Sequence, residues 1–139
     1  MNNCYICSIK DSTSTHIYRS LYINGVDILK GGCLSCAFFV SSILVKFKMI
    51  EKTHATVRNT VRGMKDFGWK KVKLENIRKG DVIVWEKKKQ DDEKSHFHIG
   101  FYIGDKKAIS NSWYRKSPWK HSYNYNRKRK IISVFTFFD

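Results

Sequence analysis

The stretch SCAFFVSSILVKFKM (residues 35–49) decides the fold, because it predicts a helix at the centre of the molecule. It contains neither Gly nor Pro and is too long for an ordinary strand. Its apolar residues lie on nearly all sides of a helix, so the segment is expected to be buried. Ser35 stands where an N-cap is preferred, which places Cys36 in the first helical turn.

The segments that follow this helix predict a second helix and then a sheet. The second helix is expected from Thr53 to Gly68, where the glycine ends it. Beyond Gly68 the apolar period changes, and strands are expected at 69–74, 82–85, 97–103, 108–113 and 131–138, with a tight turn at 104–106. Helices that precede strands in this way predict an α+β fold with a mainly antiparallel sheet.

Three segments give weaker signals. Residues 1–30 show polar clusters around short apolar pieces, with turn or break signals at Asn24-Gly25 and Gly31-Gly32. Residues 87–95 carry mixed charges and are expected to form a solvated loop. In residues 114–130, aromatic residues alternate with cationic ones. This pattern is typical of an exposed hairpin with amphipathic side chains, and it would also suit a surface that binds single-stranded nucleic acid.

Composition and charge restrict the class of protein. The 139 residues are 42% hydrophobic and 14% aromatic, too apolar for a disordered chain, and their number predicts one domain over residues 1–139. The formal net charge of +15 favours binding to anionic partners such as nucleic acid, anionic lipid surfaces or the anionic polymers of a bacterial wall. A biased nucleotide composition of the gene would also produce a Lys-rich protein. Charge alone therefore identifies no partner, and the oligomeric state stays open.

The N-terminus, MNNCYICSIKDSTSTH, lacks the basic region and apolar run of a signal peptide. The longest apolar stretch, residues 34–45, is interrupted by serines and too short to span a bilayer. We therefore expect no membrane span and a protein that is cytoplasmic as synthesised. Action outside a cell would require phage lysis or a dedicated secretion system.

The four cysteines have two interpretations. Cys4, Cys7, Cys33 and Cys36 form two Cys-x-x-Cys pairs, a spacing found in zinc ribbons. A zinc-stapled basic module that binds nucleic acid is the alternative function that this spacing supports. Against it, ribbon pairs sit on turns, whereas Cys36 opens an apolar helix.

The second interpretation makes Cys36 a nucleophile that requires no metal. Unpaired backbone N–H groups and the helix dipole at a helix N-terminus favour a thiolate, and the same groups can hold an oxyanion. His98, at the start of a predicted strand, is the expected base. His96 is a second candidate, while surface roles are expected for His54 and His121.

Three ordered blocks resemble NlpC-type cysteine peptidases. They are Cys36-Ala37-Phe38-Phe39-Val40, Gly80-Asp81-Val82-Ile83-Val84-Trp85 and His98-Ile99-Gly100-Phe101-Tyr102-Ile103-Gly104. The resemblance covers residues 31–113, and the amidase-like CHAP domains share the same layout. It departs from the family at Ser35, where Asp is usual, and at Ala37 and Phe38, which replace Ser and Gly.

The resemblance implies a papain-like fold and a cysteine hydrolase that cleaves amide bonds of peptidoglycan stem peptides or cross-links, with no cofactor. Cys36 falls on the nucleophile and His98 on the base. The third, orienting residue falls on Ser110 or, through a one-residue bulge, on Asn111, whose amide oxygen suits an imidazole N–H. The further residues expected at the substrate are Ser35, Tyr102, Ser110 and Trp113.

Overall fold

The computed structural model describes residues 3–15, 22–23, 25–27, 35–89, 95–112 and 114–137. Its α-helices are α1 (Asn3–Asp11), α2 (Cys36–Lys46) and α3 (Val57–Phe67), and a 3-10 helix spans Leu74–Asn76. Its strands are β1 (Tyr22–Ile23), β2 (Val26–Asp27), β3 (Lys70–Val72), β4 (Val82–Lys89), β5 (Ser95–Gly104), β6 (Lys107–Ser112), β7 (Ser117–Ser122) and β8 (Ile131–Thr136).

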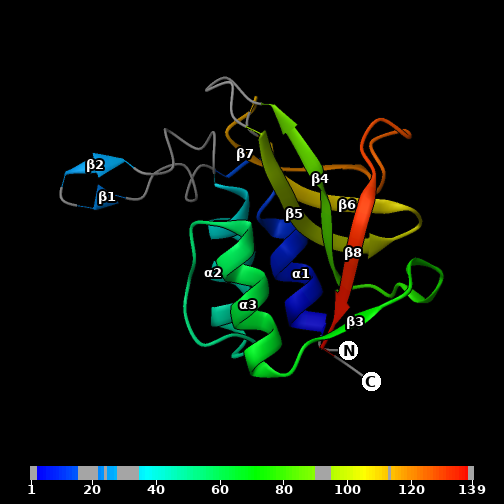
Figure 1. Ribbon diagram of the computed structural model, residues 1–139, viewed down its shortest axis with the longest axis horizontal. Coiled ribbons are helices and arrows are strands. Elements are labelled where there is room, and N and C mark those ends of the chain that lie inside the picture. Colours follow the sequence, from blue (N-terminus) through cyan, green and yellow to red (C-terminus); the bar gives the residue numbers. More distant parts are fainter. Residues whose placement is uncertain are drawn as a thin grey trace.

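The principal sheet has the strand order β3-β8-β4-β5-β6-β7, and every neighbouring pair is antiparallel. The three helices lie together on one side of this sheet (Figure 1). The predicted α+β class is therefore confirmed. The closing strand β8 inserts between β3 and β4, so the last strand in the chain lies inside the sheet rather than at its edge.

The main core fills the space between the helices and the sheet. Phe39 of α2 meets Phe101 of β5 edge to face at 5.4 Å between ring centroids, and Tyr5 of α1 meets the same ring at 5.9 Å. All three side chains are fully buried. Tyr5 also donates its hydroxyl to the Gly80 carbonyl at 2.8 Å, which satisfies its polar end within the core. These contacts fix α2 relative to β5, the two elements that carry Cys36 and His98.

The predicted helices are present with small differences in length. The α2 helix begins directly after Ser35, as expected, and ends at Lys46, three residues before the predicted end at Met49. The α3 helix begins after Thr56, whose side chain accepts the Asn59 N–H, and ends at Gly68, which adopts φ = 114°. That left-handed conformation is favourable for glycine and explains the stop.

Several elements were not predicted, and two of them contribute to the core or to the principal sheet. The segment before residue 12 forms α1, whose Tyr5 and Ile9 point into the core at a spacing of four residues. The basic segment 114–130 contains β7, which pairs with β6 from Lys107↔Ser122 to Ser112↔Ser117. The expectation that this segment is simply an exposed hairpin is therefore wrong for residues 117–122.

The other face of the sheet carries a smaller apolar cluster. Ile83, Trp85 and Ala108 are fully buried there beneath Tyr123 and Tyr125, which belong to the connection between β7 and β8. Trp85 donates its indole N–H to the Tyr123 carbonyl at 2.7 Å. Among the described residues, the structure contains no helix with the length and apolar character needed to cross a membrane.

Candidate active site

Cys36 is the first residue of α2, where backbone N–H groups have no partner within the helix. The Phe39 N–H already donates to the Ser35 carbonyl at 2.9 Å and closes the first turn. The thiol lies within reach of the N–H groups of Ala37 and of Cys36 itself, and of Ile99 on β5. Ile99 directly follows His98, so the thiol lies beside the strand that carries the expected base.

The thiol is protonated at neutral pH. Burial raises the pKa of Cys36 above its ordinary value of 9.0, and this effect outweighs the backbone N–H groups and the Arg129 charge, which act in the opposite direction. The backbone N–H groups at the helix N-terminus lower the pKa of the thiol, as expected, but they do not offset the burial of the sulfur. Desolvation of a charged sulfur is the stronger effect in this environment.

His98 is almost completely buried, with 6% of its surface exposed. Its Nε2 atom lies 2.8 Å from Ser110 Oγ on the neighbouring strand β6. Burial, together with the nearby Arg129 charge and His121, holds the pKa of His98 well below its ordinary value of 6.5. The ring is consequently neutral at neutral pH, the protonation state that a general base requires.

Ser110 is the centre of a buried polar cluster. Besides His98, its hydroxyl oxygen lies 2.7 Å from His121 Nε2 and 3.0 Å from the Tyr125 hydroxyl. The His121 ring stacks on the Tyr125 ring at 4.1 Å between centroids. Burial lowers the pKa of His121 to about 4, so this second imidazole is also neutral at neutral pH.

The hydrogen-bond partners assign the proton positions in this cluster. His121 Nδ1 lies 2.6 Å from the Ser122 carbonyl, which only accepts, so Nδ1 carries the proton and Nε2 is an acceptor. Ser110 therefore donates its single proton to His121 Nε2 and accepts from Tyr125 and from His98 Nε2–H. In the neutral His98 ring, Nδ1 is then the unprotonated nitrogen.

Asn111 does not take the orienting position that was expected for it. His98 Nε2–H donates to Ser110, whereas Asn111 Nδ2 donates to Ser35 Oγ on the helix side of the sheet. The bulge that Asn111 required is absent between Gly100 and Tyr102, because these residues pair regularly with Ser110 to Ala108 of β6. Successive residues of a strand face opposite sides of the sheet. Ser110 and Asn111 therefore cannot both point to the side on which the His98 ring lies.

Arg129 adds a positive charge that was not expected at this site. Its Nε donates to the Glu86 carbonyl and its Nη2 to the His96 carbonyl, each at 3.0 Å. The held guanidinium lowers the pKa of the Cys36 thiol and of His98. A fixed cation beside the sulfur stabilises negative charge that develops there.

Gly100 allows the polar cluster to form. A Cβ atom at this position would lie 2.6 Å from Ser110 Cβ, 2.7 Å from the Ile109 carbonyl oxygen and 3.1 Å from the Trp85 ring. Ser110, Ile109 and Trp85 occupy the space that a side chain at this position would need. Trp85 in turn packs against the rings of His98, at 5.2 Å, and His121, at 5.5 Å.

The other predicted substrate residues are less closely grouped. Ser35 is fully buried beside Asn111, and its hydroxyl accepts the amide hydrogen bond just described. Tyr102 lies four residues along β5 from His98, about 13 Å away in a strand, and packs against Tyr123. Trp113 lies outside the described residues. His96, the second candidate base, contributes its carbonyl to Arg129.

The predicted zinc ligands are separated in the structure as far as it describes them. Cys4 and Cys7 are exposed on α1, while Cys36 is half-buried at the start of α2. Cys33 lies outside the described residues. Among the residues that are described, no three His, Cys, Asp or Glu side chains are grouped to hold a metal ion.

Sequence reasoning missed His121, Tyr125 and Arg129, all of which come from the basic segment 114–130. The mixture of aromatic and cationic residues in that segment was the available signal, but it indicated a surface. The pairing of β7 with β6 and the packing of residues 123–130 on Trp85 bring these side chains to the site instead.

Comparison with known proteins gives no family for this chain. No protein-family model matches the sequence, and no curated protein matches it either.

Proposed function

We propose that this protein is a cysteine hydrolase of papain-like, NlpC-type architecture that cleaves amide bonds through an acyl-enzyme. The observation that carries the proposal is the hydrogen-bonded series His98–Ser110–His121, in which His98 directly precedes Ile99, the residue whose backbone N–H contacts the Cys36 thiol at the N-terminus of α2. Such a series fixes the orientation and tautomer of a base, which is the requirement for activating a thiol.

In the first step, His98 Nδ1 takes the proton of the Cys36 thiol as the sulfur attacks the amide carbon. The resting pair is neutral, because burial raises the pKa of the thiol and lowers that of His98, so proton transfer accompanies the attack. The carbonyl π electrons move to oxygen, and the N–H groups at the start of α2 stabilise that oxyanion. Arg129 stabilises the negative charge that develops at the sulfur.

In the second step, the C–N bond breaks and the amine nitrogen receives the proton from His98. A thioester then joins the acyl group to Cys36. His98, neutral again, takes a proton from water as the water oxygen attacks the thioester carbon. Collapse of this intermediate breaks the C–S bond, and the sulfur recovers its proton from His98.

We propose peptidoglycan stem peptides or cross-links as the substrate class. The three sequence blocks that resemble NlpC-type enzymes support this choice. The +15 net charge supports it as well, because anionic wall polymers would concentrate a strongly basic enzyme at their surface.

The experiment that tests this function incubates the purified protein with peptidoglycan sacculi and identifies released fragments by mass spectrometry. Wild-type protein is expected to release peptides with new amino and carboxyl ends, and acid quenching is expected to trap an acyl adduct on Cys36. Cys36→Ala and His98→Ala are expected to reduce the rate by at least about a thousandfold. Cleavage that survives Cys36→Ala would contradict the proposal.

Cys4→Ala is the matched control. The residue is exposed on α1, so the hydrolase requires no contribution from it, and activity is expected to be unchanged. A zinc-stapled nucleic-acid module would give the opposite set of results. It would bind one zinc ion that is lost in Cys4→Ala, show salt-dependent affinity for oligonucleotides, and leave both sacculi and a library of peptide amides uncut.

A further inference from the structure

A groove between α3 and the sheet is separate from the Cys36–His98 site. Its volume is about 400 Å³, within the range of small-molecule sites. One wall is α3, and the floor crosses four neighbouring strands, β3, β8, β4 and β5. Its apolar lining consists of Val57, Val61, Val84, Phe97, Ile132 and Phe135.

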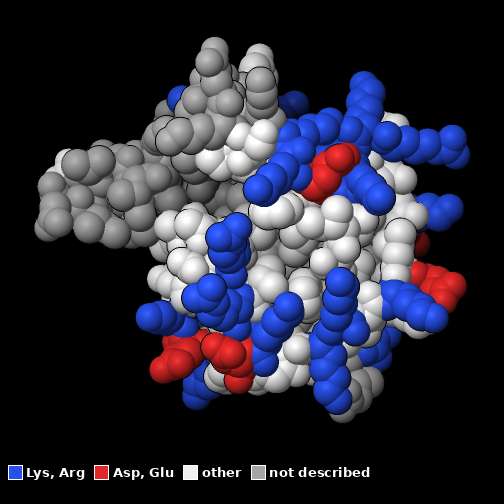
Figure 2. Space-filling view, in the orientation of Figure 1, with Lys and Arg blue, Asp and Glu red and all other residues white. Residues whose placement is uncertain are grey.

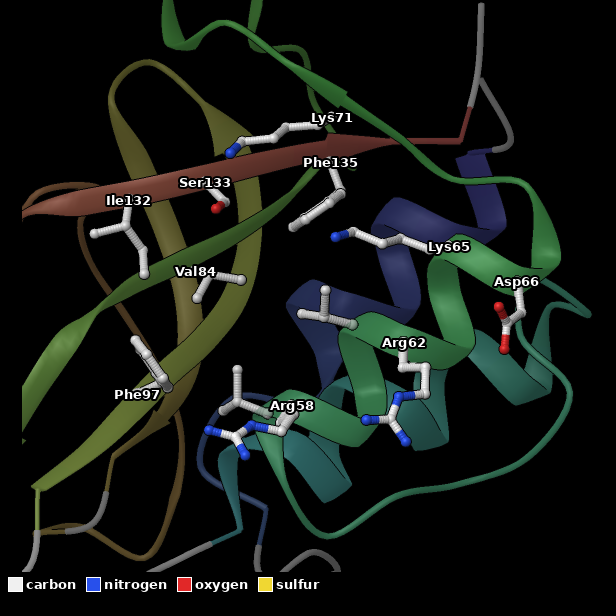
Figure 3. A pocket seen from close by; sticks show the side chains of 12 residues that line it. Arg58, Arg62, Lys65, Asp66, Lys71, Val84, Phe97, Ile132, Ser133 and Phe135 are labelled. Atoms are coloured by element: carbon white, nitrogen blue, oxygen red, sulfur yellow. The ribbon is translucent and has the colours of Figure 1, made fainter.

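The floor of the groove is mostly apolar. Figure 3 shows Val84, Phe97 and Phe135 projecting from the strands toward α3. The strands beneath are hydrogen-bonded to one another, with Val84 opposite both Ser133 and Ile99, so their backbone groups are already paired. A bound peptide would find no strand edge to extend here, whereas an alkyl chain needs only apolar contact.

The rim of the groove is cationic. Arg58, Arg62 and Lys65 lie along α3, and Lys71 lies on the β3 side (Figure 3). Within the described part of the chain, none of the four forms an ion pair or side-chain hydrogen bond, and the only carboxylate that lines the groove is Asp66. In the view of Figure 2, Lys and Arg cover much of this side of the molecule and the carboxylates form a few small groups.

Two aromatic rings of the floor each have a lysine ammonium group above them. Lys65 Nζ lies 5.7 Å from the centroid of Phe135, and Lys87 Nζ lies 4.9 Å from that of Phe97. Positive charge is therefore held directly over apolar surface at both ends of the floor. This arrangement complements a molecule that combines an apolar chain with a negative group.

From this combination, we infer that the groove binds an anionic amphiphile, a single alkyl chain that ends in a phosphate or carboxylate group. The chain would lie on the floor between α3 and β4, and Arg58 and Arg62 would contact the headgroup. Arginine suits both headgroups, because its planar donors match their oxygen geometry. The inference does not rest on the proposed hydrolase, since none of the groove residues belongs to that site.

The test titrates the full-length protein with octyl phosphate, octanoate, octanol and inorganic phosphate below any aggregation threshold, using calorimetry and amide NMR shifts. Octyl phosphate and octanoate are expected to bind saturably at one site and to shift the amides of Val61 and Phe97. Octanol and inorganic phosphate are each expected to bind at least about tenfold more weakly, because octanol lacks the negative group and inorganic phosphate lacks the alkyl chain. A stronger response to one of the two anions identifies the headgroup.

Variants locate the binding site. The double variant Arg58→Gln/Arg62→Gln is expected to weaken octyl phosphate binding about tenfold. Ile132 is exposed on the side of the groove opposite α3, and Ile132→Trp is expected to block the groove. The matched control Lys10→Gln/Lys120→Gln removes the same charge at another cavity and is expected to change affinity less than about twofold. Equal binding of octanol, shifts outside the groove, or groove binding by an oligonucleotide but not by octyl phosphate would each overturn the inference.

Discussion

At the scale of single residues, burial decides the charge state of the candidate site. Cys36 has three backbone N–H groups and Arg129 to favour a thiolate, yet its pKa is raised because the sulfur is removed from water. His98 has no carboxylate partner among its described hydrogen bonds, so nothing compensates the burial of its positive form. The two groups therefore rest as a neutral thiol and a neutral imidazole.

The His121 acceptor determines which nitrogen of His98 carries the proton. In His121→Phe, the Ser110 hydroxyl loses its acceptor and is free to donate to His98 Nε2, which moves the proton of His98 to Nδ1. We expect the rate of amide cleavage to fall about 10–100-fold, as for other residues that orient a functional imidazole. Kinetics on the proposed peptidoglycan substrate measure this effect, and ¹⁵N NMR of the His98 ring reports the tautomer.

A conservative variant separates this role from simple packing. His121→Gln retains a carbonyl oxygen that can accept the Ser110 proton and is expected to recover most of the rate. Trp119→Phe, also on β7 but 36% exposed, is the control and should leave the rate unchanged. An unaltered His98 tautomer in His121→Phe would show that His121 acts only by packing.

At the scale of elements, strong local patterns explain which parts were predictable. The apolar run of α2 and the β-branched and aromatic run of β5 contain no breakers, and both were predicted close to their observed positions. Counting through the turn at residues 104–106 placed Ser110 at the orienting position. The Ser110 hydroxyl lies 2.8 Å from His98 Nε2, although the backbone of Ser110 pairs with Gly100 rather than with His98.

The elements that were missed have weak local patterns. The α1 helix is short, and its buried Tyr5 and Ile9 alone do not distinguish it from irregular chain. The β7 strand contains Pro118, which argues against a strand except at a sheet edge, and β7 is indeed an edge. His121 could not be assigned to the site from sequence, because its position depends on the β6–β7 pairing.

The close approach of β5 and β6 gives a prediction at Gly100. In Gly100→Ala the new methyl group would lie 2.6 Å from Ser110 Cβ and 2.7 Å from the Ile109 carbonyl oxygen, so the strands must separate. We expect the free energy of unfolding to fall by about 1–3 kcal/mol, the usual cost of overpacking. Urea denaturation measures this change.

Ser95→Ala, at an exposed position on the same strand, is the control for Gly100→Ala and should change stability by less than about 0.5 kcal/mol. Because the clash involves Ser110, Gly100→Ala is also expected to lower the amide cleavage rate. Stability equal to that of the wild type would mean that the two strands can move apart without cost.

At the scale of the whole molecule, two uncharged histidines, the buried His98 and the half-buried His121, lie in a protein of net charge +15. The exposed cations of the groove and the surface remain in water, whereas His98 and His121 lie under the segment that follows β7. The same packing that keeps these rings neutral makes their protonation unfavourable in the folded state. Folding stability should therefore depend on pH through them.

For His121 the sign and size of this dependence follow from its pKa, about 4 in the folded state against 6.5 ordinarily. Above pH 6.5 the ring is neutral in both the folded and the unfolded chain, so its titration does not change the free energy of unfolding. As the pH falls from 6.5 toward 4, the unfolded chain binds a proton that the folded chain does not, and the wild type loses about 3 kcal/mol of stability from this ring.

Asp81 acts in the opposite direction. Burial raises the pKa of its carboxyl group, so acid stabilises the folded protein relative to the unfolded chain through this residue. The His121 contribution therefore has to be measured by comparing variants. His121→Phe removes the His121 contribution, together with its smaller effect on the pKa of His98, and leaves Asp81 in place. The difference in unfolding free energy between wild type and His121→Phe, measured in urea at pH 7.5, 6, 5 and 4.5, is expected to shift steadily in favour of the variant as the pH falls. Parallel pH profiles would mean that His121 is as easily protonated in the folded protein as in the unfolded chain, and the neutral hydrogen-bond arrangement around Ser110 would then be wrong.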